Sequence, residues 1–202
     1  MSTASKYLAA DERRAMTVAS VLALAAEHTP VEITTAAIAA RMGLSQAAVF
    51  RHFPTKDAVW RAVMDWVAEE LLRRVEQAAR AAASPLAALE AVFLAHVGFV
   101  LEYPGVPRML FGELQRTGST PAKAAAVELL DRYGQFLVAL LEQGQAAGEV
   151  RADVAPPVAV SMFIGAIQGL IMQSLLAGDM ERMRALAPQS FALYCRAIGR
   201  TS

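Results

Sequence analysis

Apolar residues recur at intervals of three and four along most of this chain, which is the spacing of one face of an α-helix. No stretch alternates apolar and polar residues as a half-buried strand does. Prolines and glycines fall at the breaks between these periodic stretches. The pattern therefore predicts an all-α protein, with helices that begin at Asp11, Thr34 or Thr35, Ser45, Lys56, Pro85, Val106, Pro121, Pro156 and Gln189.

Residues 34–53 contain signals for two short helices joined by a tight turn. Thr34 or Thr35 can cap the first helix, and Ser45 can cap the second, because a hydroxyl there accepts from a free backbone N–H. Gly43 can take the positive φ that ends the first helix. An ordinary helical hairpin would not favour two caps, a turn glycine and an acid-free cationic surface within twenty residues, so the segment predicts a helix-turn-helix.

The second of these helices has two different faces. Val49 and Phe53 share one stripe, which we expect to pack. The other side is free to read DNA, because the second helix of a helix-turn-helix enters the major groove. That side carries Gln46, Ala47, Phe50 and Arg51.

Charge is informative only locally. The chain has 19 basic and 19 acidic residues and a formal net charge of zero, which gives no sign of nucleic acid. Between Arg41 and Lys56, however, there are three cations, one histidine and no acid. This window concentrates positive potential on the predicted reading helix.

The run TTAAIAARMGLSQAAVFRHFPTKDAVW resembles the N-terminal domain of TetR-family transcriptional repressors, including the aromatic-x-His-Phe-x-x-Lys motif at residues 50–56. The resemblance implies a DNA-binding domain at 1–55, with three helices, and a larger helical effector-binding and dimerisation domain at 56–202. It also implies a homodimer joined through a four-helix bundle of the final two long helices, and a repressor that a small lipophilic effector releases from a palindromic operator. Phe50 departs from the family's usual tyrosine, whose hydroxyl tends to touch a phosphate.

These observations define the expected DNA contacts. Arg51 and Gln46 are the expected contacts to base edges, and Thr34, Thr35, His52 and Lys56 are expected on phosphates. The full predicted set is Thr34, Thr35, Ser45, Gln46, Ala47, Phe50, Arg51, His52 and Lys56. The first helix is expected to cover them with Met16, Ala19, Leu22, Ala23 and Ala26.

Polar residues on otherwise apolar stripes are the expected effector contacts in the larger domain. The candidates are His96, Tyr103, Arg108, Glu113, Tyr133 and Gln168, with Gln173 as a further one. Each can instead face solvent or a partner subunit, and His96 can be a hydrogen-bonded core histidine.

The segment after Pro156 is apolar enough to be mistaken for a membrane span. Gln168 and Gln173 within it, and acidic rather than basic flanks, favour burial inside protein instead. Ser161, Gly165 and Gly169 lie four apart and predict a close helix-packing face, expected between subunits. The last helix is expected to be broken at Pro188.

Other features narrow the function. Cys195 is the only cysteine, so neither a disulfide nor a metal site is expected, and a cytoplasmic location is the plain inference. No secretory signal is expected at the N-terminus. We expect no enzyme and no cofactor, because the chain lacks phosphate-loop, nucleophile-elbow and HExxH motifs. The alternatives are a transcriptional activator and a helical dimer that uses the fold for protein interaction.

Overall fold

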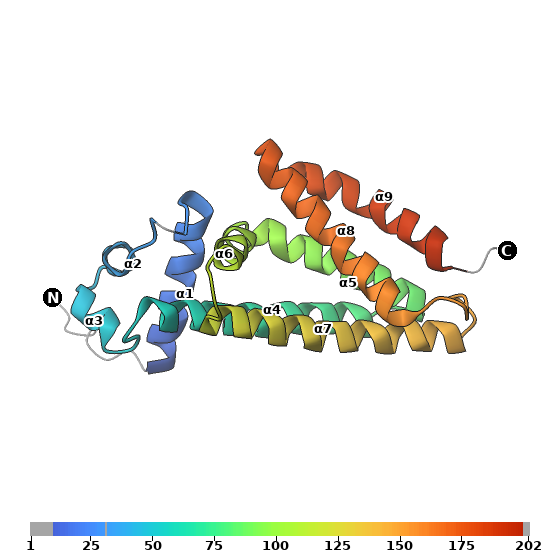
Figure 1. Cartoon of the computed structure of the whole chain (residues 1–202), viewed down its shortest axis with the longest axis horizontal. Helices are drawn as coiled ribbons and strands as arrows, with labels where there is room; N and C mark the ends of the chain where they lie inside the picture. Colours follow the sequence, from blue (N-terminus) through green and yellow to red (C-terminus); the bar gives the residue numbers. More distant parts are fainter. Residues whose placement is uncertain (1–9, 31, 200–202) are drawn as a thin grey trace. The chain divides into compact units, whose positions relative to one another are not determined.

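The computed structural model describes residues 10–30 and 32–199. Within these ranges the only regular elements are nine α-helices and one isolated antiparallel bridge between Val150 and Gly199, so the predicted all-α class is confirmed. The described residues form two compact units (Figure 1). The first comprises 10–68 and 103–127, and the second comprises 69–102 and 128–199.

The first unit contains four helices and the ends of two others. They are α1 (Ala10–Glu27), α2 (Thr35–Arg41), α3 (Gln46–Phe50) and α6 (Gly105–Leu114), with the start of α4 (Lys56–Arg80) and of α7 (Pro121–Ala146). α6 packs against α1, and α2 packs against α3 (Figure 1). The unit therefore includes the predicted helix-turn-helix together with a segment from the middle of the chain.

The buried face of α1 differs from the expected one. Leu22 is buried as predicted, but Met16 is 40% exposed and Ala19 is also exposed, whereas Val18, Val21 and Ala25 are buried. The reason is that α6 also covers α1, so two overlapping apolar stripes are available and the one containing Val18 and Val21 is used. The local spacing of apolar residues does not distinguish these two stripes.

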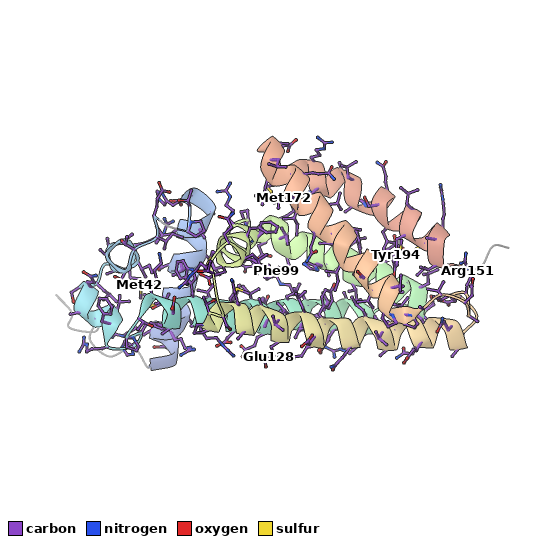
Figure 2. All side chains as sticks on the ribbon, viewed as in Figure 1. Met42, Phe99, Glu128, Arg151, Met172 and Tyr194 are labelled. Atoms are coloured by element: carbon purple, nitrogen blue, oxygen red, sulfur yellow. The ribbon has the colours of Figure 1, made fainter. Side chains whose placement is uncertain are left out.

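The second unit is built on α5 (Pro85–Glu102), α8 (Pro156–Ala177) and α9 (Glu181–Ile198), with the remaining parts of α4 and α7. Edge-to-face and tilted aromatic contacts join Phe93, Phe163, Phe191 and Tyr194 from these three helices. The Tyr194 hydroxyl donates to the Ala159 carbonyl at 3.1 Å (Figure 2). These aromatic side chains form the core that holds α5, α8 and α9 together.

The predicted break at Pro188 is wrong, because α9 continues through this residue. Pro188 is exposed, so the carbonyl of Arg184 that lacks its helical donor can be solvated. The neighbours Ala187 and Phe191 are buried and hold the helix in place. Packing of a buried stripe outweighs the local cost of one proline here.

One face of α8 is open in the single chain. Gln168 and Gln173 were expected to be buried, but both are exposed. Met172, which Figure 2 labels, is 41% exposed, and Leu176 on the same helix is 81% exposed. No atom lies within 4 Å of the position that a Cβ would take at Gly165 or Gly169.

Two helices are long and apolar enough to cross a membrane by length and composition, namely Pro85–Glu102 with mean hydropathy 1.6 and Pro156–Ala177 with 1.7. Both contribute to the aromatic core of the second unit. Core helices of globular proteins also meet these criteria. The apolar stretch is therefore explained in part by packing within the chain.

Candidate functional site

Two side-chain caps and a glycine build the α2–α3 turn. The Thr34 hydroxyl accepts from the Ala37 amide at 3.1 Å, and the Ser45 hydroxyl accepts from the Ala48 amide at 3.3 Å. Gly43 has φ of +65° between the two helices, in the left-handed region that favours glycine. The predicted caps and turn are therefore confirmed, with Thr34 rather than Thr35 as the first cap.

The short helix α3 has one packed side and one open side. Ala48 and Val49 are buried, as is Phe53 just beyond the helix. Every residue expected to face DNA from this helix is exposed, namely Gln46, Ala47, Phe50 and, at its C-cap, Arg51. Phe50 is 40% exposed, which leaves an aromatic ring available for sugar or thymine-methyl contact.

The polar residues around α3 differ in how they are held. Gln46 Nε2 donates to Thr35 Oγ1 at 2.8 Å, so two of the candidate residues contact each other across the turn. The Arg51 and His52 side chains are exposed, and within the described residues neither forms a hydrogen bond or ion pair. Arg51 is therefore the cation of this surface best placed to reach outward.

Lys56 begins α4, as predicted, but its ammonium points into protein contacts. Nζ donates to the Pro30 carbonyl at 3.1 Å and lies 4.9 Å from the centroid of the Trp60 ring. Burial, followed by the nearby Arg116 charge, lowers the pKa of Lys56. The ammonium has further donors, but in this structure it fastens α4 to the connector between α1 and α2.

The acid-free window along the chain does not remain acid-free in space. Arg41 donates from Nη1 and Nη2 to the two carboxylate oxygens of Glu27, each at 3.0 Å. This fork lowers the pKa of Glu27 and raises that of Arg41. Glu27 precedes the window by 14 residues, so a count of charges within the window missed it.

Gly105 brings α6 close to α1, and Gly112 brings it close to the connector after α1. A Cβ at Gly105 would lie 2.7 Å from the Ala25 Cβ and 2.8 Å from the backbone, and one at Gly112 would lie 3.0 Å from Pro30. Arg108 Nη1 donates to the Ala26 carbonyl at 2.8 Å, near the C-terminal end of α1. Arg108 therefore holds α6 on α1 in this structure rather than reaching into the second unit.

Glu113 is a buried acid with a full set of partners. It is 4% exposed, and it accepts from Thr120 Oγ1 at 2.7 Å and from Arg116 Nη1 at 3.1 Å. Arg116 Nη1 also donates to Asp57 in the first turn of α4 at 2.9 Å. Arg116, which no pattern in the sequence singled out, joins α4 to the segment between α6 and α7. It therefore helps to position the start of α4, which follows the reading head, the part of the chain formed by α1, α2 and α3.

Of the six predicted effector residues, two meet. His96 on α5 and Tyr133 on α7 bring Nδ1 and the hydroxyl oxygen to 3.3 Å. Tyr103 packs edge-on against Trp66, with ring centroids 5.0 Å apart. Tyr103, Arg108 and Glu113 all belong to the first unit, where Arg108 and Glu113 have the partners described above. Gln168 lies on the open face of α8.

An open groove of about 480 Å³ lies along the second half of α4 and α5. Its walls include Arg74, Phe99 and Glu102, and small residues supply most of the remainder. Arg74 Nη2 donates to Glu102 at 3.2 Å, and its guanidinium carbon lies 5.5 Å from the centroid of the Phe99 ring. None of the predicted effector residues lines this groove.

Comparison with known proteins identifies both parts of the chain. Residues 20–63 match the model of bacterial regulatory proteins of the tetR family, and residues 115–189 match a tetracyclin repressor-like C-terminal domain. A nucleoid occlusion factor SlmA from Marinomonas sp. (strain MWYL1) is 24% identical over 155 residues, which cover 76% of this chain and 79% of that protein.

Solved structures share the fold. The transcriptional regulator FadR from Bacillus subtilis, in complex with stearoyl-CoA, has a TM-score of 0.80 at 16% identity, covering 90% of this chain and 97% of that one. A TetR transcription regulator from Haloarcula marismortui ATCC 43049 has a TM-score of 0.81 at 20% identity, covering 94% and 100%. With both family models matched and the helix-turn-helix in place, the chain belongs to the TetR family of DNA-binding transcriptional regulators.

Proposed function

We propose that this protein is a homodimeric transcriptional repressor that leaves a palindromic operator when a small lipophilic effector binds. The observation that carries the proposal is the open side of α3. Gln46, Ala47, Phe50 and Arg51 are exposed there, while Ala48 and Val49 anchor the helix from behind. A short helix that is packed on one side and presents an amide, a guanidinium and an aromatic ring on the other suits the major groove.

We assign a different role in DNA binding to each group of residues on this surface. Arg51 and Gln46 serve as the base-edge contacts, and Thr34, Thr35 and His52 bind phosphates beside them. Lys56 acts mainly by holding the start of α4, through its contacts with Pro30 and Trp60. A remaining hydrogen of its ammonium group donates to a phosphate of the DNA backbone. Ser45 caps the helix that does the reading.

The open face of α8 supports a homodimer. Val158, Met162, Met172 and Leu176 are 41–81% exposed on this helix, and Gly165 leaves room for a close approach. Exposed apolar area of this extent on one helix is the signature of a protein interface. A two-fold axis there places two reading heads on half-sites one helical turn apart, about 34–36 Å, or a multiple of that spacing.

An effector can act only by binding one arrangement of the dimer better than the other. α4 is suited to transmit this difference, because it runs from Lys56 beside the reading head to Arg80 in the second unit. The effector therefore prefers a dimer whose heads do not match consecutive major grooves. Binding of the effector raises the melting temperature and weakens operator binding together.

The test is fluorescence anisotropy with duplex DNA from just upstream of the coding region, beside a scrambled duplex, at two salt concentrations. A preference for the native duplex of about 10³ or more supports a specific regulator. Arg51→Ala should reduce that preference by about 1–3 kcal/mol while it keeps weak binding to both duplexes. Equal binding of the unaltered protein to both duplexes would contradict the assignment of this site to operator reading.

The relatives named nucleoid occlusion factor favour a second candidate, a DNA-binding factor with a role in nucleoid occlusion. Genome-wide binding selection separates the two functions. A repressor occupies a few promoters, and loss of the protein raises transcription there. A nucleoid-associated factor occupies many sites without a matching change in transcription.

A further inference from the structure

His96 lies in the middle of the buried face of α5. Its helical neighbours at three and four residues, Val92, Phe93, Phe99 and Val100, are each no more than 3% exposed. His96 nevertheless keeps accessible surface, while its partner Tyr133 is 1% exposed. The accessible surface of this pair therefore belongs to His96 rather than to Tyr133.

The contact with Tyr133 fixes which imidazole nitrogen carries the proton. A buried hydroxyl needs an acceptor for its one hydrogen, and Nδ1 of His96 at 3.3 Å is its side-chain partner among the described residues. The Tyr133 hydroxyl therefore donates to Nδ1, and the ring proton resides on Nε2. Nε2–H is then a fixed donor that has no acceptor in the described part of the chain.

This interior offers no positive charge. Burial lowers the pKa of His96 to about 4, so the ring is neutral at pH 7. The described residues of the second unit include no lysine, and their arginines are exposed except Arg74, which pairs with Glu70 and Glu102. A carboxylate or phosphate beside His96 would stay without a counter-charge, which is costly in an apolar environment.

We propose that His96 selects an uncharged lipophilic effector, whose carbonyl, ether or hydroxyl oxygen accepts a hydrogen bond from Nε2, and that Tyr133 is the positioning residue for the ring. The inference rests on the proposed effector-binding role of this unit and narrows it to a chemical class. This uncharged class of ligand differs from the anionic stearoyl-CoA that is bound in the Bacillus subtilis relative.

The test compares three probes of matched chain length, 2-undecanone, n-undecane and undecanoate, on the purified full-length protein. Binding is followed by the shift in melting temperature and by the ¹⁵N signals of labelled histidine, with His96 assigned from its absence in His96→Phe. We expect 2-undecanone to bind about tenfold or more tightly than undecanoate and to move the Nε2 signal of His96. n-Undecane should leave that signal in place.

Variants separate hydrogen bonding from packing. His96→Phe should bind 2-undecanone no better than n-undecane, and Tyr133→Phe should lower affinity for 2-undecanone severalfold and mix the two ring tautomers. Gln135→Ala, at an exposed position of α7, the helix that also carries Tyr133, is the matched control and should leave all three affinities unchanged. Tighter binding of undecanoate, no binding of 2-undecanone, or unchanged ketone affinity in His96→Phe would each overturn the inference.

Operator binding without any probe is measured in parallel. If the probes contradict the role of His96 but the protein still prefers its operator, the proposed repressor function is retained. Ketone binding through His96 in a protein that shows no operator preference would refute the proposed function and retain the site.

Discussion

Gln46 Nε2 donates to Thr35 Oγ1 at 2.8 Å, which links the expected base-reading residue to the helix in front of it. The amide nitrogen keeps a second hydrogen and the amide oxygen keeps its acceptor sites, so Gln46 can hold Thr35 and read adenine together. Thr35→Val should therefore weaken operator binding more when Gln46 is present than in the Gln46→Ala background. We expect a coupling of about 0.5–1 kcal/mol in a double-mutant cycle with Gln46→Ala, measured by anisotropy. Strictly additive effects would show that the contact has no part in reading.

Arg51→Ala and Lys56→Ala should differ in kind. Loss of Arg51 should relax discrimination at one base pair, with a cost of about 1–3 kcal/mol, because its exposed guanidinium is free to reach a guanine. Loss of Lys56 should weaken binding to all sequences alike and lower the salt slope. Thermal unfolding of Lys56→Ala is the necessary control, because this residue also contacts Pro30 and Trp60.

Met162→Glu should convert the dimer to a monomer. Met162 is 50% exposed on the face of α8 that also carries Gly165, and a carboxylate buried between two copies lacks a partner. Light scattering after size exclusion gives the mass directly. Leu130→Glu is the matched control, since Leu130 is 44% exposed on a different helix, α7. A dimer that survives Met162→Glu would place the interface elsewhere.

Gly105→Ala should destabilise the first unit by about 1–3 kcal/mol. The added Cβ would sit 2.7–2.8 Å from Ala25 and Ala26, where backbone atoms cannot yield. Gly98→Ala in α5 meets nothing within 4 Å and should raise stability by up to about 1 kcal/mol, because alanine is the better helix former. Urea unfolding of both variants measures the contrast, and equal stabilities would contradict the close α1–α6 contact.

Acid should destabilise the protein partly through His96. Its pKa is about 4 in the folded protein and 6.5 in an unperturbed histidine. Between these values the unfolded chain binds the proton and the folded chain does not, so the free energy of unfolding falls as pH drops from 6.5 to 4. Relative to His96→Phe, the loss should reach about 1–3 kcal/mol, measured by denaturant unfolding across this pH range. Parallel pH profiles would show that His96 is charged or solvated in the folded state.

Local signals predicted the reading head well because its determinants are local. Thr34, Gly43 and Ser45 act on amides and dihedral angles within three residues of themselves, and α3 is too short for its faces to be ambiguous. The packed and open sides of α3 could be assigned from spacing alone. Its DNA contacts remain a prediction.

Long-range pairings were not predictable in the same way. Arg116 meets Asp57 across 59 positions, and α6 competes for the surface of α1, which changes the stripe that is buried. Helix α9 continues through Pro188 because packing of Ala187 and Phe191 outweighs the local cost of a proline inside a helix. Gln168 and Gln173 were expected inside because their helix is so apolar, but a helix covered on one side only has an open side for its amides.

The fork between Arg41 and Glu27 changes how many ions DNA can displace. A guanidinium already neutralised by a carboxylate of its own chain takes no phosphate, and no counterion leaves the duplex on its account. For two heads, breaking the fork by Glu27→Gln would add roughly two released ions and steepen the dependence of log K on log salt by about 1.8. The fork thus lowers the number of cations that this surface offers to phosphates, whatever the DNA sequence.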